Sequence, residues 1–167
     1  MVVAKSCNHY DVAFERLLRL IRRPYVSVNE TRRALFRDAS LKSMDFVVYS
    51  EQTSNLLIDV KGRRFQGGSR VWENWTTQED VADLLRWEAV FGSGFRGLLV
   101  FAYELGSLRD TEQHSLIWEL CGRHYAFYGV WARDYAEFMR QRSPSWQTVS
   151  LPAEAFRRLR KPLLEIL

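Results

Sequence analysis

The stretch that decides the fold is Leu56-Leu57-Ile58-Asp59-Val60-Lys61-Gly62-Arg63-Arg64, an apolar segment that ends in charged residues. Side chains in a strand alternate between its two faces, so Leu57, Asp59 and Lys61 share one face. The opposite face carries only apolar side chains up to Val60. The segment therefore predicts a core strand with one face that becomes polar towards its end.

Asp45 begins the preceding strand-like segment, and Gln52 lies seven residues from both Asp45 and Asp59. A hairpin centred on Gln52 places the two carboxylates opposite each other on one face. Opposed like charges cost about 0.2 to 1 kcal/mol, so a compensating partner is expected. Mg²⁺ binds to one or two carboxylates together with water and phosphate oxygens. The pair therefore predicts a divalent cation site, with Lys61 close enough to neutralise a phosphate or position an attacking water.

The surrounding segments supply the rest of an α/β pattern. Apolar residues at Phe14, Leu17, Leu18 and Ile21 predict an amphipathic helix over 11–23. Further segments predict strands over 25–28, 45–49, 55–61 and 97–105, a capped helix from Thr76-Thr77-Gln78-Glu79 to about Phe91, and a hairpin formed by 114–120 and 124–132. The tail predicts a helix over 133–142, a strand over 147–150 and a short helix from Pro152. The order of helix, three strands, helix and strand is typical of an α/β sandwich.

Composition indicates one globular domain spanning 1–167. The chain is 47% hydrophobic, and its longest apolar run, Leu98 to Tyr103, is too short to cross a membrane. No signal peptide is recognisable, and Cys7 and Cys121 are too few for a disulfide framework, so a cytoplasmic location is expected. Residues 71–120 carry three basic and nine acidic side chains, whereas both flanking regions are basic. The acidic block is expected to face away from a polyanion such as DNA.

Asp45, Asp59-Val60-Lys61 and an upstream helix bearing Glu15 resemble the PD-(D/E)XK nuclease superfamily, which includes restriction endonucleases and Holliday junction resolvases. The likeness covers about residues 10–105, which leaves 106–167 as a C-terminal extension. The resemblance implies a restriction-endonuclease-like core of helix, three-stranded meander, helix and strand. It also implies DNA cleavage with Mg²⁺ or Mn²⁺, with metal-binding positions at Asp45, Asp59 and Val60, and Lys61 at the scissile phosphate.

Several alternatives stay open at this stage. Met44 stands where the family's name has proline, and Asp59 stands where glutamate is commoner. The helix carboxylate is Glu15 or, nearer the meander, Glu30. Asp59 and Lys61 also fit a solvated ion pair at a strand end, which contributes little. The same fold would suit a catalytically inactive module that binds nucleic acid or a protein.

Nucleic-acid contacts are expected just beyond the central strand. Arg63, Arg64 and Arg70 are placed to hold backbone phosphates, and Gln78 lies near the amino end of the second helix, where free backbone amides attract anions. Trp72 and Trp75 fit either stacking on unpaired bases or core packing. Because cutting both strands of DNA commonly requires two active sites, a homodimer is expected.

Overall fold

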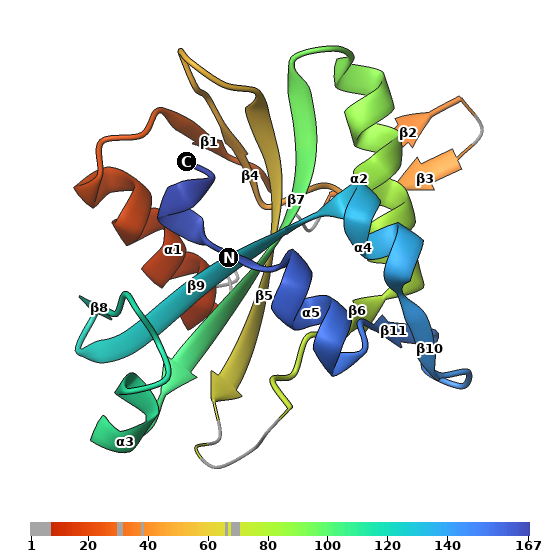
Figure 1. The fold of residues 1–167 in the computed structure, drawn as a ribbon. Coiled ribbons are helices and arrows are strands. Elements are labelled where there is room, and N and C mark those ends of the chain that lie inside the picture. Colours follow the sequence, from red (N-terminus) through yellow and green to blue (C-terminus); the bar gives the residue numbers. More distant parts are fainter. Residues whose placement is uncertain (1–7, 30–31, 38, 66, 68–70) are drawn as a thin grey trace, which may run out of the picture.

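A central mixed sheet organises the protein in the computed structural model, which describes residues 8–29, 32–37, 39–65, 67 and 71–167. The predicted mixed α/β class is confirmed (Figure 1). The sheet has seven strands in the order β1-β4-β5-β7-β9-β12, with β8 paired to β9. These strands are β1 (Tyr25–Ser27), β4 (Phe46–Val48), β5 (Asn55–Phe65), β7 (Phe95–Leu105), β8 (Trp118–Leu120), β9 (Arg123–Trp131) and β12 (Lys161–Pro162).

Helices cover both faces of this sheet, which makes three layers. One face is covered by α1 (His9–Leu20) and by side chains around the 3₁₀ helix η1 (Leu163–Glu165). The other face is covered by α2 (Gln78–Phe91), α4 (Ala132–Phe138) and α5 (Ala153–Leu159). A single turn of helix, α3 (Leu108–Thr111), follows β7. No described helix has both the length and the apolar character needed to span a membrane.

The predicted amphipathic helix is α1, which starts at the cap residue Asn8. The Asn8 side chain accepts a hydrogen bond from the Tyr10 amide at 3.2 Å, which satisfies one of the free amides of the first turn. Phe14, Leu17 and Leu18 are fully buried against the sheet. Burial of each such side chain stabilises the fold by about 1.5 to 3 kcal/mol, so this apolar face fixes α1 on the sheet.

The predicted pairing of the two central segments is confirmed. In the antiparallel pair β4 and β5, Phe46 lies opposite Ile58 and Val48 lies opposite Leu56. The Asp45 amide donates to the Ile58 carbonyl at 2.8 Å and extends this register by one residue. Asp45 therefore precedes β4 at the level of Asp59, as the symmetric hairpin requires.

Side chains of β5 alternate as the sequence predicts. Leu56, Ile58 and Val60 pack with α1 on one face, whereas Leu57 and Phe65 belong to the core on the α2 face. Asp59 and Lys61 lie between those two apolar residues on the α2 face, which holds a polar site within an apolar layer. β7 runs parallel to β5 along its full length and is buried almost throughout.

Four sequence predictions differ from the structure. A short hairpin of β2 (Ala34–Phe36) and β3 (Ala39–Leu41) interrupts the meander, and its segment has no alternation that would reveal it. The α2 cap is Thr77 with Asp80, one residue later than predicted. The helix predicted over 133–142 ends at Phe138 and gives way to β10 (Arg140–Ser143). Residues 106–167 are not an addition beside the core, because β9 and β12 belong to the central sheet.

A second, three-stranded sheet lies beside α2, in the order β10-β11-β6. It consists of β10, β11 (Thr148–Ser150) and β6 (Thr76–Thr77). The buried Asn74, just before β6, holds the segment between β11 and α5 in place. The Asn74 side chain accepts from the Leu151 amide at 2.7 Å and donates to the Leu151 carbonyl at 3.2 Å. This small sheet brings the carboxyl-terminal region to the start of α2.

Candidate active site

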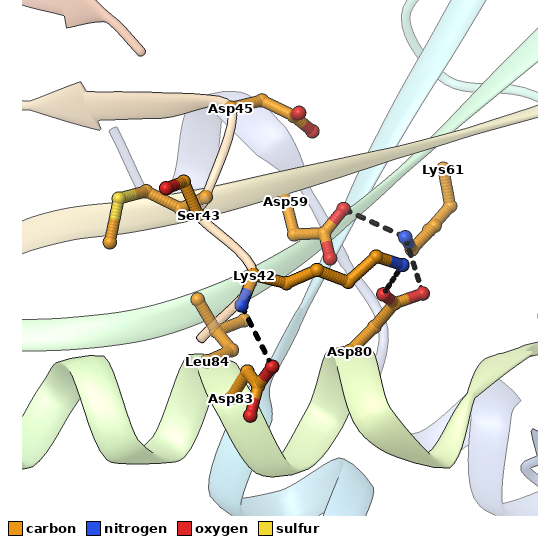
Figure 2. A pocket seen from close by; sticks show the side chains of 9 residues that line it. Lys42, Ser43, Asp45, Asp59, Lys61, Asp80, Asp83 and Leu84 are labelled. Atoms are coloured by element: carbon orange, nitrogen blue, oxygen red, sulfur yellow. Dashed lines mark hydrogen bonds and ion pairs between the residues drawn. The ribbon is translucent and has the colours of Figure 1, made fainter. Parts of the chain in front are cut away.

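Two adjoining cavities lie beside the polar middle part of β5. They share Asp45, Asp59, Lys61 and Asp80. The first cavity, of about 230 Å³, extends towards α2 and the residues before β4, and Figure 2 shows the side chains that line it. The second, of about 370 Å³, extends towards the amino end of α1 and the strand β6. The structure therefore brings Asp45, Asp59 and Lys61 together, as the sequence predicts.

Asp45 is a buried carboxylate that is fixed by the backbone of the central strand. Its Oδ2 accepts a hydrogen bond of 2.6 Å from the Val60 amide. This contact ties the carboxylate to β5 next to Asp59, because Val60 directly follows Asp59. Asp45 thus lines both cavities, and its hydrogen bond to β5 fixes the position of its carboxylate.

Lys61 lies between two carboxylates. Its Nζ is 2.9 Å from Asp59 Oδ1 and 2.9 Å from Asp80 Oδ2. Burial alone would lower the pKa of Lys61, but the two carboxylates outweigh burial and raise it well above its usual range. Burial raises the pKa of Asp59, against the opposing effect of Lys61. Lys61 is therefore a fixed cation, and Asp59 is less well compensated than Asp80.

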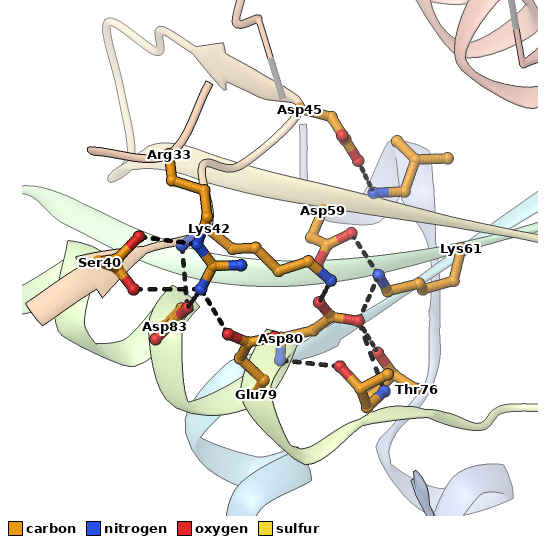
Figure 3. Close-up of polar contacts among 12 residues, drawn as sticks. Arg33, Ser40, Lys42, Asp45, Asp59, Lys61, Thr76, Glu79, Asp80 and Asp83 are labelled. Atoms are coloured by element: carbon orange, nitrogen blue, oxygen red, sulfur yellow. Dashed lines mark hydrogen bonds and ion pairs between the residues drawn. The ribbon is translucent and has the colours of Figure 1, made fainter. Parts of the chain in front are cut away.

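Asp80 holds together this part of the site (Figure 3). It accepts from Lys61, from Lys42 Nζ at 2.5 Å, and from the Thr76 hydroxyl at 3.0 Å. Burial would raise the pKa of Asp80, but Lys61 and Lys42 hold it well below its usual range. Asp80 also completes the capping box of α2 with Thr77, so the start of the helix and the site depend on one side chain.

Sequence reasoning missed Lys42 and Asp80. Lys42 follows the unpredicted β2–β3 hairpin, and no local pattern connects it to a residue 38 positions away. Asp80 did have a local signal, since Thr77 and Asp80 have the spacing of a capping box. The acidic block 71–120 does not simply face away from the site, because Asp80 and the buried Asp83 both line the first cavity.

Glu15 is not brought to the site. Its Oε1 accepts from the Tyr25 hydroxyl at 2.7 Å and from Arg19 at 3.2 Å, and the Tyr25 hydrogen bond lowers the pKa of Glu15. It is absent from the described lining of both cavities, whereas Asp11, one turn earlier on α1, lines the second. The alternative candidate, Glu30, lies outside the described residues.

Gly62 explains why the start of α1 lies so close to the site. A Cβ on Gly62 would lie 2.0 Å from Cδ2 of Tyr10, far inside van der Waals contact. Only glycine therefore allows the first turn of α1 to pack directly on β5 next to Lys61. This packing brings Asp11 to the same cavity as Asp45 and Asp59.

The expected nucleic-acid contacts are only partly placed at the site. Arg63 lines the second cavity, but its guanidinium donates to the Trp75 carbonyl and lies 3.9 Å from the centroid of the Trp75 ring. Arg64 is exposed on the opposite face of β5. Gln78 is exposed too. Its backbone amide donates to the backbone carbonyl of Gln147 at 2.9 Å and is therefore not free to bind an anion. Arg70 lies outside the described residues.

The donor set fits a hard divalent cation that keeps water ligands. Asp45 and Asp59 offer carboxylate oxygens at the same two cavities. Two carboxylates with open space beside them suit Mg²⁺, which keeps several waters and takes few protein ligands. Among the residues that the structure describes, no three histidine, cysteine, aspartate or glutamate side chains are grouped to enclose a metal. The arrangement thus offers an open site rather than a closed structural one.

Comparison with known proteins shows a likeness of fold. No protein-family model and no curated protein matches the sequence. The fold is similar to that of Hjc, a Holliday junction resolvase from the archaeal hyperthermophile Archaeoglobus fulgidus, with a TM-score of 0.57 and 13% identity. The match covers 95% of this chain and 97% of the resolvase chain. The likeness shows a shared fold that extends over nearly the whole chain.

Proposed function

We propose that this protein is a metal-dependent DNA endonuclease with a restriction-endonuclease-like core, and that Asp45, Asp59 and Lys61 form its active site. The observation that carries the proposal is the register of β4 and β5, which brings two carboxylates and a lysine to one pair of cavities. The resolvase fold supports the same reading. A branched DNA is the proposed substrate because the similar structure is that of a Holliday junction resolvase.

Each residue has a distinct task in this proposal. Asp45, Asp59 and the Val60 position would hold Mg²⁺ or Mn²⁺, which supplies Lewis-acid activation of water and stabilises charge on the reacting phosphate. Lys61 stays protonated and neutralises the scissile phosphate. Asp80 restrains the Lys61 ammonium group from the side opposite Asp59. Asp11 takes the place proposed for a helix carboxylate, because Glu15 is held by Tyr25 and Arg19.

The assembly and location follow from the same proposal. Cleavage of both strands at a branch requires two active sites, so a homodimer is part of the proposal, as is a cytoplasmic location. Neither Arg64 nor Gln78 lies in the described cavities, so the proposed phosphate contacts there depend on DNA that extends beyond the site.

A non-catalytic nucleic-acid-binding module is the second candidate. The observation that favours it is the position of Lys61, whose ammonium group already lies between Asp59 and Asp80. A lysine compensated in this way would stabilise an inactive core without any metal. The two candidates differ in one respect that can be tested, which is bond cleavage.

The test is incubation of purified protein with four-way junction, linear, nicked and single-stranded DNA, in Mg²⁺, Mn²⁺ or EDTA. We expect cleavage of junction DNA with either metal and none in EDTA. Asp59→Ala and Lys61→Ala should abolish cleavage, whereas Leu20→Ala, an exposed position on the far side of α1, should not. Binding without cleavage on every substrate would favour the non-catalytic module instead.

A further inference from the structure

An exposed tryptophan stands at the tip of the β10–β11 hairpin, apart from the catalytic residues. All six tryptophans lie in the described ranges, and only Trp146 is exposed, with 78% of its surface accessible to water. Trp72 and Trp75, for which the sequence left base stacking and core packing open, are partly buried under arginine side chains, which agrees with packing. Among the six tryptophans, Trp146 is therefore the one whose ring is open to a ligand, and a tryptophan ring supplies a large, flat contact surface.

The hairpin is connected directly to the proposed active site. β11 pairs with β6, and the Gln147 carbonyl, next to Trp146, accepts from the Gln78 amide at the start of α2. Thr76 of β6 donates to Asp80, the residue that holds Lys61. Figure 1 shows this hairpin projecting from the edge of the molecule beyond α4. The tip is therefore connected to the site through backbone contacts as far as β6 and α2, and from there through the side chains of Thr76 and Asp80.

The strand β10, which leads to the tip, carries two arginines. The segment from 138 to 153 contains Arg140 and Arg142, both exposed, and no acidic residue. The Arg142 guanidinium lies 5.2 Å from the centroid of the Trp75 ring. The Arg63 guanidinium lies 3.9 Å from the same centroid. Arg63 and Trp75 line the second cavity. A row of cationic side chains therefore leads from the hairpin to the proposed site.

We propose that Trp146 stacks on an unpaired base of a DNA strand whose backbone follows Arg142 and Arg63 into the second cavity. This inference rests on the proposed function and adds to it the feature of the substrate that is recognised. Base stacking on aromatic side chains tolerates any sequence, and arginines along the backbone supply the accompanying charge. The surface therefore favours DNA with unpaired nucleotides next to the cut over fully paired duplex.

The test is equilibrium binding in EDTA, so that cleavage does not enter. The probes are a fluorescein-labelled single-stranded oligonucleotide, its duplex, and the same duplex with a short single-stranded gap. We expect Trp146→Ala to weaken binding of the single strand and the gapped duplex about fivefold or more, and to leave the duplex nearly unchanged. Trp146→Phe keeps a ring and should retain most of the affinity, and Leu20→Ala, 63% exposed on α1, is the matched control.

Four outcomes would overturn parts of this account in distinguishable ways. Equal affinity of Trp146→Ala and the parent protein for the single strand overturns the stacking inference, whether or not the protein cuts DNA. Loss of dimers in sedimentation of Trp146→Ala, with DNA binding intact, assigns the ring to self-association and also overturns it. Tight, Trp146-dependent binding without cleavage in Mg²⁺ upholds the stacking and overturns only the nuclease. No binding of the parent protein to any probe overturns both.

Discussion

Two side-chain clusters lie on the same face of β5. One reduces the free-energy cost of burying polar groups by pairing charges, and the other does so by packing neutral aromatic rings. The charged cluster consists of Lys42, Asp59, Lys61 and Asp80, whose side chains pair with one another. The aromatic cluster, four residues along β5, consists of Phe65, Trp72, Tyr103, His114 and Tyr128, whose rings lie 4.7 to 6.5 Å apart. Arg63, over the Trp75 ring, stands between them in the sequence.

The aromatic cluster keeps its histidine ring neutral. His114 Nδ1 lies 2.8 Å from the Tyr128 hydroxyl, while the buried Nε2 has no hydrogen-bond partner among the described residues. Burial, with a smaller contribution from Arg160, lowers the pKa of His114 to about 4. This face of the sheet therefore accommodates neutral aromatic packing as well as paired charges. Clusters of buried charges are also typical of active sites, which agrees with the proposed function.

The largest expected effect is the loss of Asp80. Asp80→Ala leaves Lys61 and Lys42 without their shared carboxylate, and removal of one partner from a buried ion pair costs about 3 to 5 kcal/mol. It also removes the Asp80 side-chain half of the α2 capping box, whereas the bond from the Asp80 backbone amide to Thr77 is kept. Urea unfolding should show this decrease in the free energy of unfolding, and Asp80→Asn should show a smaller one. A decrease in the free energy of unfolding no larger than that for an exposed ion pair would mean that Asp80 does not stabilise Lys42 and Lys61 as a buried partner.

The next effect distinguishes the two carboxylates of α1. Asp11→Asn should lower the cleavage rate of junction DNA about 10- to 100-fold, as loss of an assisting group beside a metal site does. Glu15→Gln should keep nearly the full rate, because Glu15 contacts Tyr25 and Arg19 rather than the cavities. The reverse result in a single-turnover assay would restore Glu15 as the helix carboxylate.

The aromatic cluster predicts a dependence of stability on pH. Because the pKa of His114 is lowered in the folded state, the unfolded chain binds a proton first as the pH falls below 6.5. Folding stability is therefore full above pH 6.5 and decreases towards pH 4, by at most about 1.4 kcal/mol per pH unit. His114→Gln should flatten this slope in urea titrations at several pH values. His124→Gln, at an exposed histidine, should leave it unchanged.

The smallest effect is expected at the outer edge of α2. Arg33 and Glu79 form an ion pair of 2.5 Å, but both side chains are largely exposed. Glu79→Ala should leave the free energy of unfolding unchanged within the error of a urea titration, because exposed pairs contribute little. A decrease comparable with that of Asp80→Ala would remove the contrast between buried and exposed pairs on this helix.

Sequence patterns predict the part of the charged cluster that local geometry fixes. The alternation of β5 and the symmetric hairpin with β4 place Asp45, Asp59 and Lys61 correctly, because strand period and loop length set the register. The aromatic cluster could not be predicted in this way, since His114 meets Trp72 only through the packing of distant segments. The same limit applies to Lys42, whose contact with Asp80 depends on the β2–β3 hairpin.

The errors have equally specific causes. Glu15 and Asp11 both lie on α1, and the choice between them depends on the approach of Tyr10 to Gly62, which no helical period reveals. The hairpin tip at Trp146 lies between the predicted helix over 133–142 and the predicted strand over 147–150, and the turn there has only Pro144 and two serines as signals of a hairpin.

Binding of Mn²⁺, followed by the loss of the electron paramagnetic resonance signal of the free ion, tests the central claim most directly. The claim is that Asp45 and Asp59 hold one divalent cation beside the middle of β5. We predict that the parent protein and Glu79→Ala bind one equivalent of Mn²⁺, and that Asp45→Asn and Asp59→Asn each lose this binding. Equal binding by all four proteins, or by none, would contradict the claim.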